Sequence, residues 1–247
     1  MFRSFLIIAS LSQLLISFVQ AHGYVSSPPS RAFLCKQGNA TDCGQIQYEP
    51  QSVEAPKGLP FIWDGDGKLC SAGLSQFSQL DRQGPGVWST TLASPVSSFN
   101  WTLTAPHATT DFKYFITKQG WNSSTTDGLY ADDFDSDPFL VVPMHGQVPL
   151  PTLSHNITKL PQRSGYQVVF AVWTIDNTAN AFYQCLDLDF GESSTASTTA
   201  SQSSGSTTSV TNFDIRVQYF CALLRYLVVL LDFICCDCHH YSWPWQG

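Results

Sequence analysis

The chain has 247 residues, of which 43% are hydrophobic and 13% are charged, and its formal net charge is −7. This length and apolar content allow a well-packed core and exclude a wholly disordered chain. The acidic balance argues against binding to nucleic acid through phosphates, because that mode needs clustered Lys and Arg.

The first 21 residues have the pattern of a secretion signal. Arg3 precedes an apolar stretch at residues 5–18, and residues 19–21 (Val-Gln-Ala) supply a cleavage site of small-residue type. The alternative is an uncleaved membrane anchor. Cleavage after Ala21 makes His22 the first residue of the mature protein, and we therefore expect a secreted, extracellular protein.

Secretion favours two kinds of covalent modification. Four Asn-x-Ser/Thr sequons predict N-glycosylation at Asn39, Asn100, Asn122 and Asn156. Secretion also favours disulfides, and four cysteines of the globular part allow three pairings. Cys35 and Cys43 close a short loop and form the natural local pair. That pairing leaves Cys70 to join Cys185.

Composition divides the mature chain into three parts. Residues 22–190 have a globular composition, whereas residues 191–211 are rich in Ser and Thr and predict a linker or an O-glycosylated stalk. The last part, residues 212–247, contains a mostly apolar stretch and ends in a cluster of Cys and His. Three interpretations of this tail stay open: a metal-binding cluster, a lipid-anchor signal that attaches the protein to the cell surface, and an error in the gene prediction.

The globular part carries strand patterns. Alternating or β-branched and aromatic residues, bounded by turn residues, predict strands at residues 98–104, 111–117, 166–175 and 182–190. Residues 55–92 show no sustained period, apart from one short helix expected near residues 74–80. Short strands over about 170 residues therefore predict an all-β fold, one β-sandwich with a long irregular loop region.

A histidine at a mature N-terminus is an efficient metal chelator. The α-amine and the imidazole of His22 supply two nitrogens, and a second histidine supplies a third. Three nitrogens in a T suit copper, whereas zinc prefers a tetrahedron. The candidate second ligands are His107, His145 and His155. His107 is favoured because it follows a predicted strand, where a loop can hold a ligand in place.

Several motifs occur in one order along the chain. They are HGYV at 22–25, QYEPQSVE at 47–54, APHATT at 105–110, YFITK at 114–118, RSGY at 163–166, AVW at 171–173 and NTANAFYQ at 177–184. Together, behind a signal that ends just before His22, they resemble lytic polysaccharide monooxygenases of auxiliary activity family 10, the chitin-binding-protein type. The resemblance covers essentially all of residues 22–190. It implies a secreted copper enzyme with an immunoglobulin- or fibronectin-III-like β-sandwich and a long loop between its first strands.

The resemblance also implies roles at the metal. His22, through its amine and imidazole, and His107 would hold one copper ion as a histidine brace. Phe182 and Ala105 would flank its two axial positions, and an inert phenylalanine there limits crowding and self-oxidation. Glu54 would be the nearby carboxylate, since such a group can hydrogen-bond a peroxide and pass a proton.

The expected substrate surface is flat, because a crystalline polysaccharide presents a plane. The resemblance implies contacts from Tyr48, Glu49, Gln51, Thr104, Asn177 and Asn180. A tyrosine face can stack on a sugar ring or on an N-acetyl group. The family often has Asp at the position of Asn177, so this chain lacks one charge there. Trp173 is implied to be a buried aromatic near the copper.

The predicted activity is oxidative cleavage of crystalline chitin at C1, with an external reductant and with oxygen or hydrogen peroxide as co-substrate. The segment YEPQSVE at 48–54 resembles chitin-active members more than cellulose-active ones. The alternatives are a non-catalytic chitin-binding module and the same chemistry on cellulose. A glycoside hydrolase is disfavoured, because hydrolysis uses paired carboxylates across a cleft and no such pair stands out. No protein partner is implied, and we expect a monomer.

Overall fold

The computed structural model describes residues 21–61 and 67–192. The predicted tail, residues 212–247, lies outside the described residues, as does almost all of the predicted signal peptide and linker. The chain divides into two units, Met1–Thr195 and Ala196–Gly247, and the described residues all belong to the first. Within the described ranges, no helix is long and apolar enough to cross a membrane.

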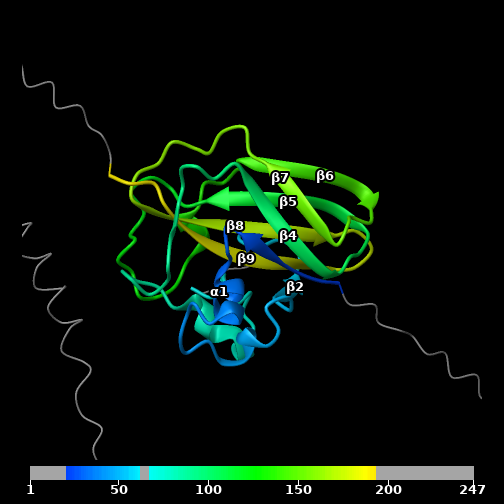
Figure 1. Cartoon of the computed structure of the whole chain (residues 1–247), viewed down its shortest axis with the longest axis horizontal. Coiled ribbons are helices and arrows are strands. Elements are labelled where there is room, and N and C mark those ends of the chain that lie inside the picture. Colours follow the sequence, from blue (N-terminus) through cyan, green and yellow to red (C-terminus); the bar gives the residue numbers. More distant parts are fainter. Residues whose placement is uncertain (1–20, 62–66, 193–247) are drawn as a thin grey trace, which may run out of the picture. The chain divides into compact units, whose positions relative to one another are not determined.

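The described residues form a β-sandwich of two sheets, as Figure 1 shows. The smaller sheet has the order β1-β4-β7, and its strands are β1 (His22–Ser27), β4 (Ser98–Ala105) and β7 (Thr152–Asn156). The larger sheet has the order β2-β9-β8-β5-β6, with β3 also beside β9. Its strands are β2 (Glu54–Pro56), β3 (Thr91–Leu92), β5 (Thr109–Ile116), β6 (Leu140–Gln147), β8 (Tyr166–Ile175) and β9 (Asn180–Asp189). This architecture confirms the all-β prediction.

The four strands predicted from residue patterns are present as β4, β5, β8 and β9. The prediction for β8 matches at both ends, and the other three differ by one or two residues at an end. The residue patterns do not predict β6, because Pro143 and Gly146 interrupt its alternation. Strands β2 and β3 have 3 and 2 residues, too few for a period to show.

Strand β9 buries apolar side chains on both of its faces. Leu186 and Leu188 pack in the core between the two sheets. Tyr183 and Cys185 point the other way and pack against residues of the irregular region, such as Phe77. The irregular region therefore covers the outer face of the larger sheet, and Figure 1 shows α1 and its neighbouring loops on that side of β9.

The connection between β1 and β4, which includes the irregular region, contains short helices, and one more follows β5. The helix expected near residues 74–80 is present as a 3-10 helix, Ser75–Asp81, and two other 3-10 helices span Gly44–Gln47 and Ala131–Asp133. The residue patterns miss α1 (Arg31–Gln37), although both of its ends carry sequence signals. Ser30 accepts a hydrogen bond from the Phe33 amide at the start, and Gly38 ends the helix with φ of 74°.

Two disulfides fasten this region. Cys35 bonds to Cys43 and Cys70 bonds to Cys185, the pairing predicted from the sequence. The second bridge joins the irregular region to β9 across 115 residues. Closing so long a loop restricts the unfolded chain, and such a bridge typically contributes about 2 to 4 kcal/mol to stability.

A buried arginine joins α1 to β9. The guanidinium of Arg31 donates from Nε and Nη2 to the two carboxylate oxygens of Asp187, at 2.9 and 2.8 Å. Both side chains are almost fully buried, with exposed fractions of 1% and 0%. Burial acts to lower the pKa of Arg31, but the charge and hydrogen bonds of Asp187 and Tyr166 outweigh it, and the pKa lies above its ordinary value. Arg31 is therefore a buried cation neutralised by one carboxylate.

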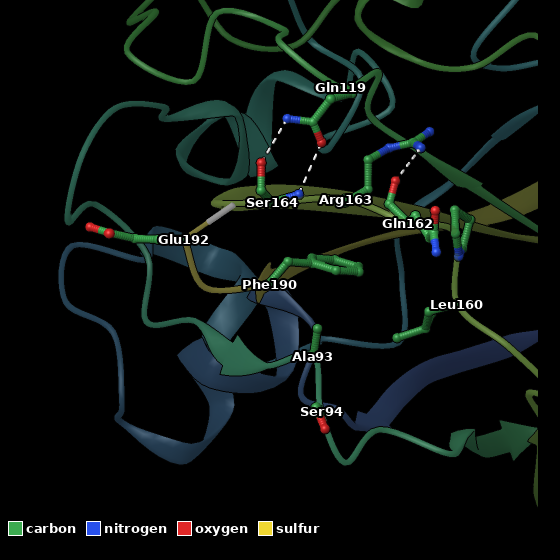
Figure 2. A pocket seen from close by; sticks show the side chains of 10 residues that line it. Ala93, Ser94, Gln119, Leu160, Gln162, Arg163, Ser164, Phe190 and Glu192 are labelled. Atoms are coloured by element: carbon green, nitrogen blue, oxygen red, sulfur yellow. Dashed lines mark hydrogen bonds between the residues drawn. The ribbon is translucent and has the colours of Figure 1, made fainter. Parts of the chain in front are cut away.

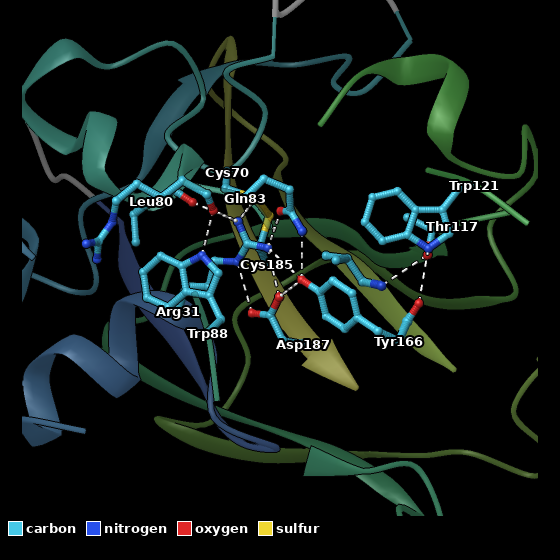
Figure 3. Close-up of polar contacts among 12 residues, drawn as sticks. Arg31, Cys70, Leu80, Gln83, Trp88, Thr117, Trp121, Tyr166, Cys185 and Asp187 are labelled. Carbon is cyan, nitrogen blue, oxygen red and sulfur yellow. Dashed lines mark hydrogen bonds and ion pairs between the residues drawn. A yellow bond between two sulfur atoms is a disulfide. The ribbon is translucent and has the colours of Figure 1, made fainter. Parts of the chain in front are cut away.

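Figure 3 shows the other partners of this arginine. Nη1 donates to the carbonyl oxygen of Leu80 at 2.9 Å, and Nη2 donates to Oε1 of Gln83 at 2.7 Å. The guanidinium also lies 5.0 Å from the ring centroid of Trp88. The charge of Arg31 thus connects three segments: α1, the 3-10 helix Ser75–Asp81 with the residues that follow it, and the end of β9.

Candidate metal centre

Two histidines lie at one end of the smaller sheet. His22 begins β1 and pairs with Ala105 at the end of β4. His107 follows Ala105 by two residues, in the turn that leads to β5. Because β1 and β4 are antiparallel neighbours, the first residue of the predicted mature chain lies beside the turn that carries the second histidine. The two histidines therefore belong to neighbouring segments at one end of the smaller sheet.

The start of β1 is held closely against its neighbours. The Gly23 amide donates to the Gln51 carbonyl oxygen at 3.2 Å, and Thr104 Oγ1 donates to the His22 carbonyl oxygen at 3.5 Å. A Cβ atom at Gly23 would meet Cδ2 of Leu103 at 2.5 Å. A side chain after His22 would therefore have to displace the buried side chain of Leu103, and glycine avoids that displacement.

The turn that carries His107 is held from the core. Thr109 Oγ1 donates to the His107 carbonyl oxygen at 2.8 Å. The indole nitrogen of Trp173, which is fully buried, donates to the same hydroxyl at 2.8 Å. Trp173 thus supports the turn through the hydroxyl of Thr109, in agreement with the expectation of a buried aromatic near the site.

The His107 ring has one nitrogen, Nδ1, that is buried without a hydrogen-bond partner in the protein. An unpaired buried nitrogen is costly, and such atoms usually have a ligand or an ordered water as partner. An imidazole nitrogen is also a good donor for copper. The donor set of His22 and His107 therefore fits a copper ion, with the α-amine as third nitrogen once the chain begins at His22.

No group of three or more His, Cys, Asp and Glu that could hold a metal occurs in the described ranges. A brace does not need such a group, because two of its three nitrogens come from one residue. The centre is recognised from strand register and from the position of the predicted cleavage site rather than from a cluster of side chains.

Phe182 lies beside the first histidine, and Glu54 pairs with Phe182. The ring centroid of Phe182 is 6.2 Å from that of His22 and 5.0 Å from that of Trp173. Phe182 is fully buried and has Glu54 as its partner in the pairing of β2 with β9. Asn180 Nδ2 donates to Glu54 Oε1 at 2.9 Å. The structure thus brings the aromatic and the carboxylate implied by the resemblance to the end where His22 lies.

The hydrogen bond from Asn180 to Glu54 was not expected from the sequence, which assigns Asn180 to the substrate surface. Nothing in the spacing of these residues signals it, since they are 126 positions apart. An amide that donates to a carboxylate oxygen limits the rotation of that carboxylate. Asn180 is therefore placed to orient Glu54.

The other residues assigned to the substrate surface lie in two connections and at the end of one strand. Tyr48 and Glu49 follow the 3-10 helix at Gly44–Gln47, and Tyr48 is 81% exposed. Gln51, in the same connection, is the residue that accepts from β1. Thr104 is exposed at the end of β4, and Asn177 is exposed in the β8–β9 turn. Their roles toward a substrate stay predictions.

The two other candidate histidines have different surroundings. His145 is exposed on the edge strand β6, with φ of 52°. His155 is buried between the sheets, where Nδ1 lies 2.5 Å from the hydroxyl of Tyr114 and the ring contacts Phe112. Burial lowers the pKa of His155 to about 4, so this side chain is a neutral core residue at neutral pH.

A hollow of about 790 Å³ lies at the opposite end of the sandwich, near the start of β8 and the end of β9 (Figure 2). Arg163 at its rim is already paired with Asp135. Gln119 and Ser164 hydrogen-bond to each other twice, as Figure 2 shows. The polar groups of Gln119, Arg163 and Ser164 are thus already paired, and the hollow is separate from the His22 site.

Comparison with known families decides the identity of this arrangement. A family model described as lytic polysaccharide mono-oxygenase, cellulose-degrading, matches residues 22–188, which is more than half of the chain. The chain belongs to this monooxygenase family. The match begins at His22, the residue that pairs with Ala105 at the candidate metal centre.

Individual relatives agree. The chain is 68% identical over 192 residues to a lytic polysaccharide monooxygenase C of auxiliary activity family 10 from Mycosarcoma maydis, covering 77% of this chain and 59% of that protein. It is 41% identical over 180 residues to GlcNAc-binding protein A of Shewanella oneidensis, covering 72% and 38%. The chain therefore spans only part of the length of these relatives.

A solved structure gives the same result. A lytic polysaccharide monooxygenase of auxiliary activity family 10 from Streptomyces lividans superposes with a TM-score of 0.64 and 46% identity, covering 68% of this chain and 100% of that one. The family resemblance and the β-sandwich expected from the sequence are thus confirmed. Members of this family are copper-dependent enzymes that cleave polysaccharides by oxidation, and the described domain has the sequence and the fold of this family.

Proposed function

We propose that this monooxygenase is secreted and oxidises crystalline chitin at C1. The observation that carries the proposal is the pairing of His22 with Ala105, which brings the predicted mature N-terminus beside the turn of His107. The imidazole of His107 in that turn supports it, since imidazole nitrogens are good donors for copper.

His22 and His107 would hold one copper ion, which supplies one-electron redox chemistry with an external reductant and with oxygen or hydrogen peroxide. Phe182 has no hydroxyl and cannot become a further ligand, as a tyrosine in its place would. Ala105, whose side chain is a single methyl group, would leave room beside the ion. Glu54, oriented by Asn180, can accept a hydrogen bond or carry a proton at its carboxylate oxygens. These residues therefore keep the site open and supply its proton chemistry.

Chitin is favoured over cellulose by two observations, although the family model is described as cellulose-degrading. The relative from Shewanella oneidensis is named for binding GlcNAc, the monomer of chitin. Tyr48 offers a ring that is 81% exposed, suited to stacking on a sugar or an acetamido group. The same chemistry on cellulose, and a non-catalytic chitin-binding module, are the alternatives.

Secretion brings further expectations. The sequons at Asn39, Asn122 and Asn156 are exposed, and Asn100 is half-buried on β4. We expect N-glycans at these positions and a domain that works as a monomer, with residues 191–211 as its linker. The meaning of residues 212–247 stays open, and an anchor there would hold the protein at the cell surface.

The test is mass spectrometry of products. The secreted protein, with its native N-terminus at His22 and loaded with copper, is incubated with β-chitin and ascorbate. We expect chito-oligosaccharides with aldonic acid ends, absent without ascorbate and absent after chelation of the metal. Oxidised products from cellulose alone would transfer the proposal to that substrate, and tight chitin binding without any product would leave a binding module.

Replacing the carboxylate near the histidines tests its role. We expect Glu54→Gln to lower the rate of oxidised product release by about 100-fold or more, because the amide cannot pass a proton. Copper affinity, measured by calorimetry, should stay unchanged, since Glu54 is not a proposed ligand. Glu49→Gln removes a carboxylate from the proposed substrate surface and serves as the control. Equal losses in both variants at saturating chitin would contradict the role of Glu54.

A further inference from the structure

The exposed side chains along β7 are polar, but those just before its first residue, at the end near the candidate metal centre, are aliphatic. Thr152, Ser154 and Asn156 alternate on the exposed face of this strand and are all polar. The next outward position is Leu150, which is 74% exposed. Val148, two residues earlier in the β6–β7 connection, is 63% exposed. Two aliphatic side chains thus project into solvent where the rest of the row is hydrophilic.

The strand register places Val148 and Leu150 next to the end of the sheet that carries His22 and His107. Thr102 pairs with Thr152, and the Leu103 amide donates to the Pro151 carbonyl oxygen at 2.7 Å. Continuing this antiparallel register brings Leu150 opposite Thr104, whose hydroxyl donates to the His22 carbonyl oxygen. Because β4 lies between β1 and β7, the backbones at Leu150 and at the start of β1 are separated by two strand spacings, roughly 10 Å.

Figure 1 shows the same arrangement. The end of β6, the start of β7 and the end of β4 come together at the right-hand end of the sandwich, where β1 also begins. The connection from β6 to β7 therefore lies at the end of the molecule that carries His22 and His107.

The β6–β7 connection is stiff. Leu150 lies between Pro149, which is buried, and Pro151, whose carbonyl oxygen is bonded to β4. Proline fixes φ, so the backbone on either side of Leu150 has little freedom. An exposed side chain on a rigid backbone loses little entropy when a partner covers it.

We propose that Val148 and Leu150 form an apolar ledge that extends the polysaccharide-binding surface beyond Thr104 and contacts the acetamido methyl groups of chitin. This inference rests on the proposed function, in that it takes the face around the histidines to be the face that meets chitin. We assign chitin as the partner because the ledge continues that face. Only β4 lies between the ledge and the strand that begins at His22. Cellulose has no acetamido methyl groups, so the ledge favours chitin.

The test is the double variant Val148→Ser/Leu150→Ser. Because both side chains are largely exposed, their loss should leave the thermal stability and the copper affinity unchanged. We expect the binding constant for β-chitin to fall about fivefold to tenfold, from the apolar area that is no longer buried. Binding to cellulose should change by less than about twofold.

Leu92→Ser is the matched control. Leu92 is 64% exposed and lies on β3 beside Asp189, at the opposite end of the sandwich from His22. We expect this variant to bind chitin like the wild type. If the double variant also binds like the wild type, while the wild type releases oxidised chito-oligosaccharides, the ledge is refuted and the proposed function stands. A wild type that neither binds nor oxidises chitin refutes both.

Discussion

His107→Ala is expected to abolish oxidised products and to weaken copper binding by more than about 100-fold. His107 supplies one of three proposed nitrogens, and alanine leaves only the two of His22. Loss of a group that merely orients a ligand costs about 10- to 100-fold in metal affinity, so the loss of a ligand should cost more. Calorimetric titration of the secreted protein with Cu(II), together with mass spectrometry of the products, measures both effects.

His145→Asn provides the matched control. It also removes one imidazole, from an exposed position on β6, and Asn tolerates the backbone φ of 52° found there. We expect its copper affinity and its products to equal those of the wild type. An unchanged affinity in His107→Ala, or equal losses in the two variants, would contradict the brace.

Asp187→Asn is expected to lower the free energy of unfolding by about 3 to 5 kcal/mol. The substitution keeps the shape of the side chain but removes the charge that neutralises Arg31. The guanidinium is 1% exposed and cannot turn to water, so it remains a buried charge without a counter-ion. Denaturation in urea, with the disulfides intact, measures the change.

Two further variants separate charge burial from other causes. Lys113→Gln breaks the pair with Asp111 on β5, where the lysine side chain is 38% exposed, and should cost less than about 1 kcal/mol. Arg31→Met/Asp187→Leu removes both buried charges and should recover much of the stability lost in the single variant. A loss in Asp187→Asn no larger than that in Lys113→Gln would show that the pair does not stabilise the fold.

The residue pattern predicted a strand best where the strand is buried along nearly its whole length. Strand β8 is buried along nearly its whole length, so its residues are mostly apolar, β-branched or aromatic, and its ends are visible in the sequence. Strand β9 shows alternation, but both of its faces are buried, and only the packing of the irregular region explains the second face. A pattern of residues reports that a face is apolar, and it does not report what covers that face.

The buried Arg31 illustrates a feature with no local signal. Arginine is common on protein surfaces, and nothing beside it in the sequence indicates burial. Its counter-ion, Asp187, lies 156 positions away. The pair becomes recognisable only when α1 packs against the end of β9.

For the metal centre, the sequence by itself predicted the ligand types and determined the family. The predicted cleavage before His22, the later APHATT segment and the order of the motifs are properties of the chain alone. The tertiary structure decided which groups meet. The pairing of β1 with β4 brings His22 to Ala105, and the pairing of β2 with β9 brings Glu54 to Phe182 and Asn180.

These meetings depend on register, which is set by the packing of two sheets around one core. A slip of one residue would turn every side chain of a strand to its opposite face, and local sequence does not record which register the distant partner adopts. The position of the apolar ledge depends on register too, because Leu150 lies near His22 only when β4 pairs with both β1 and β7 in the observed registers.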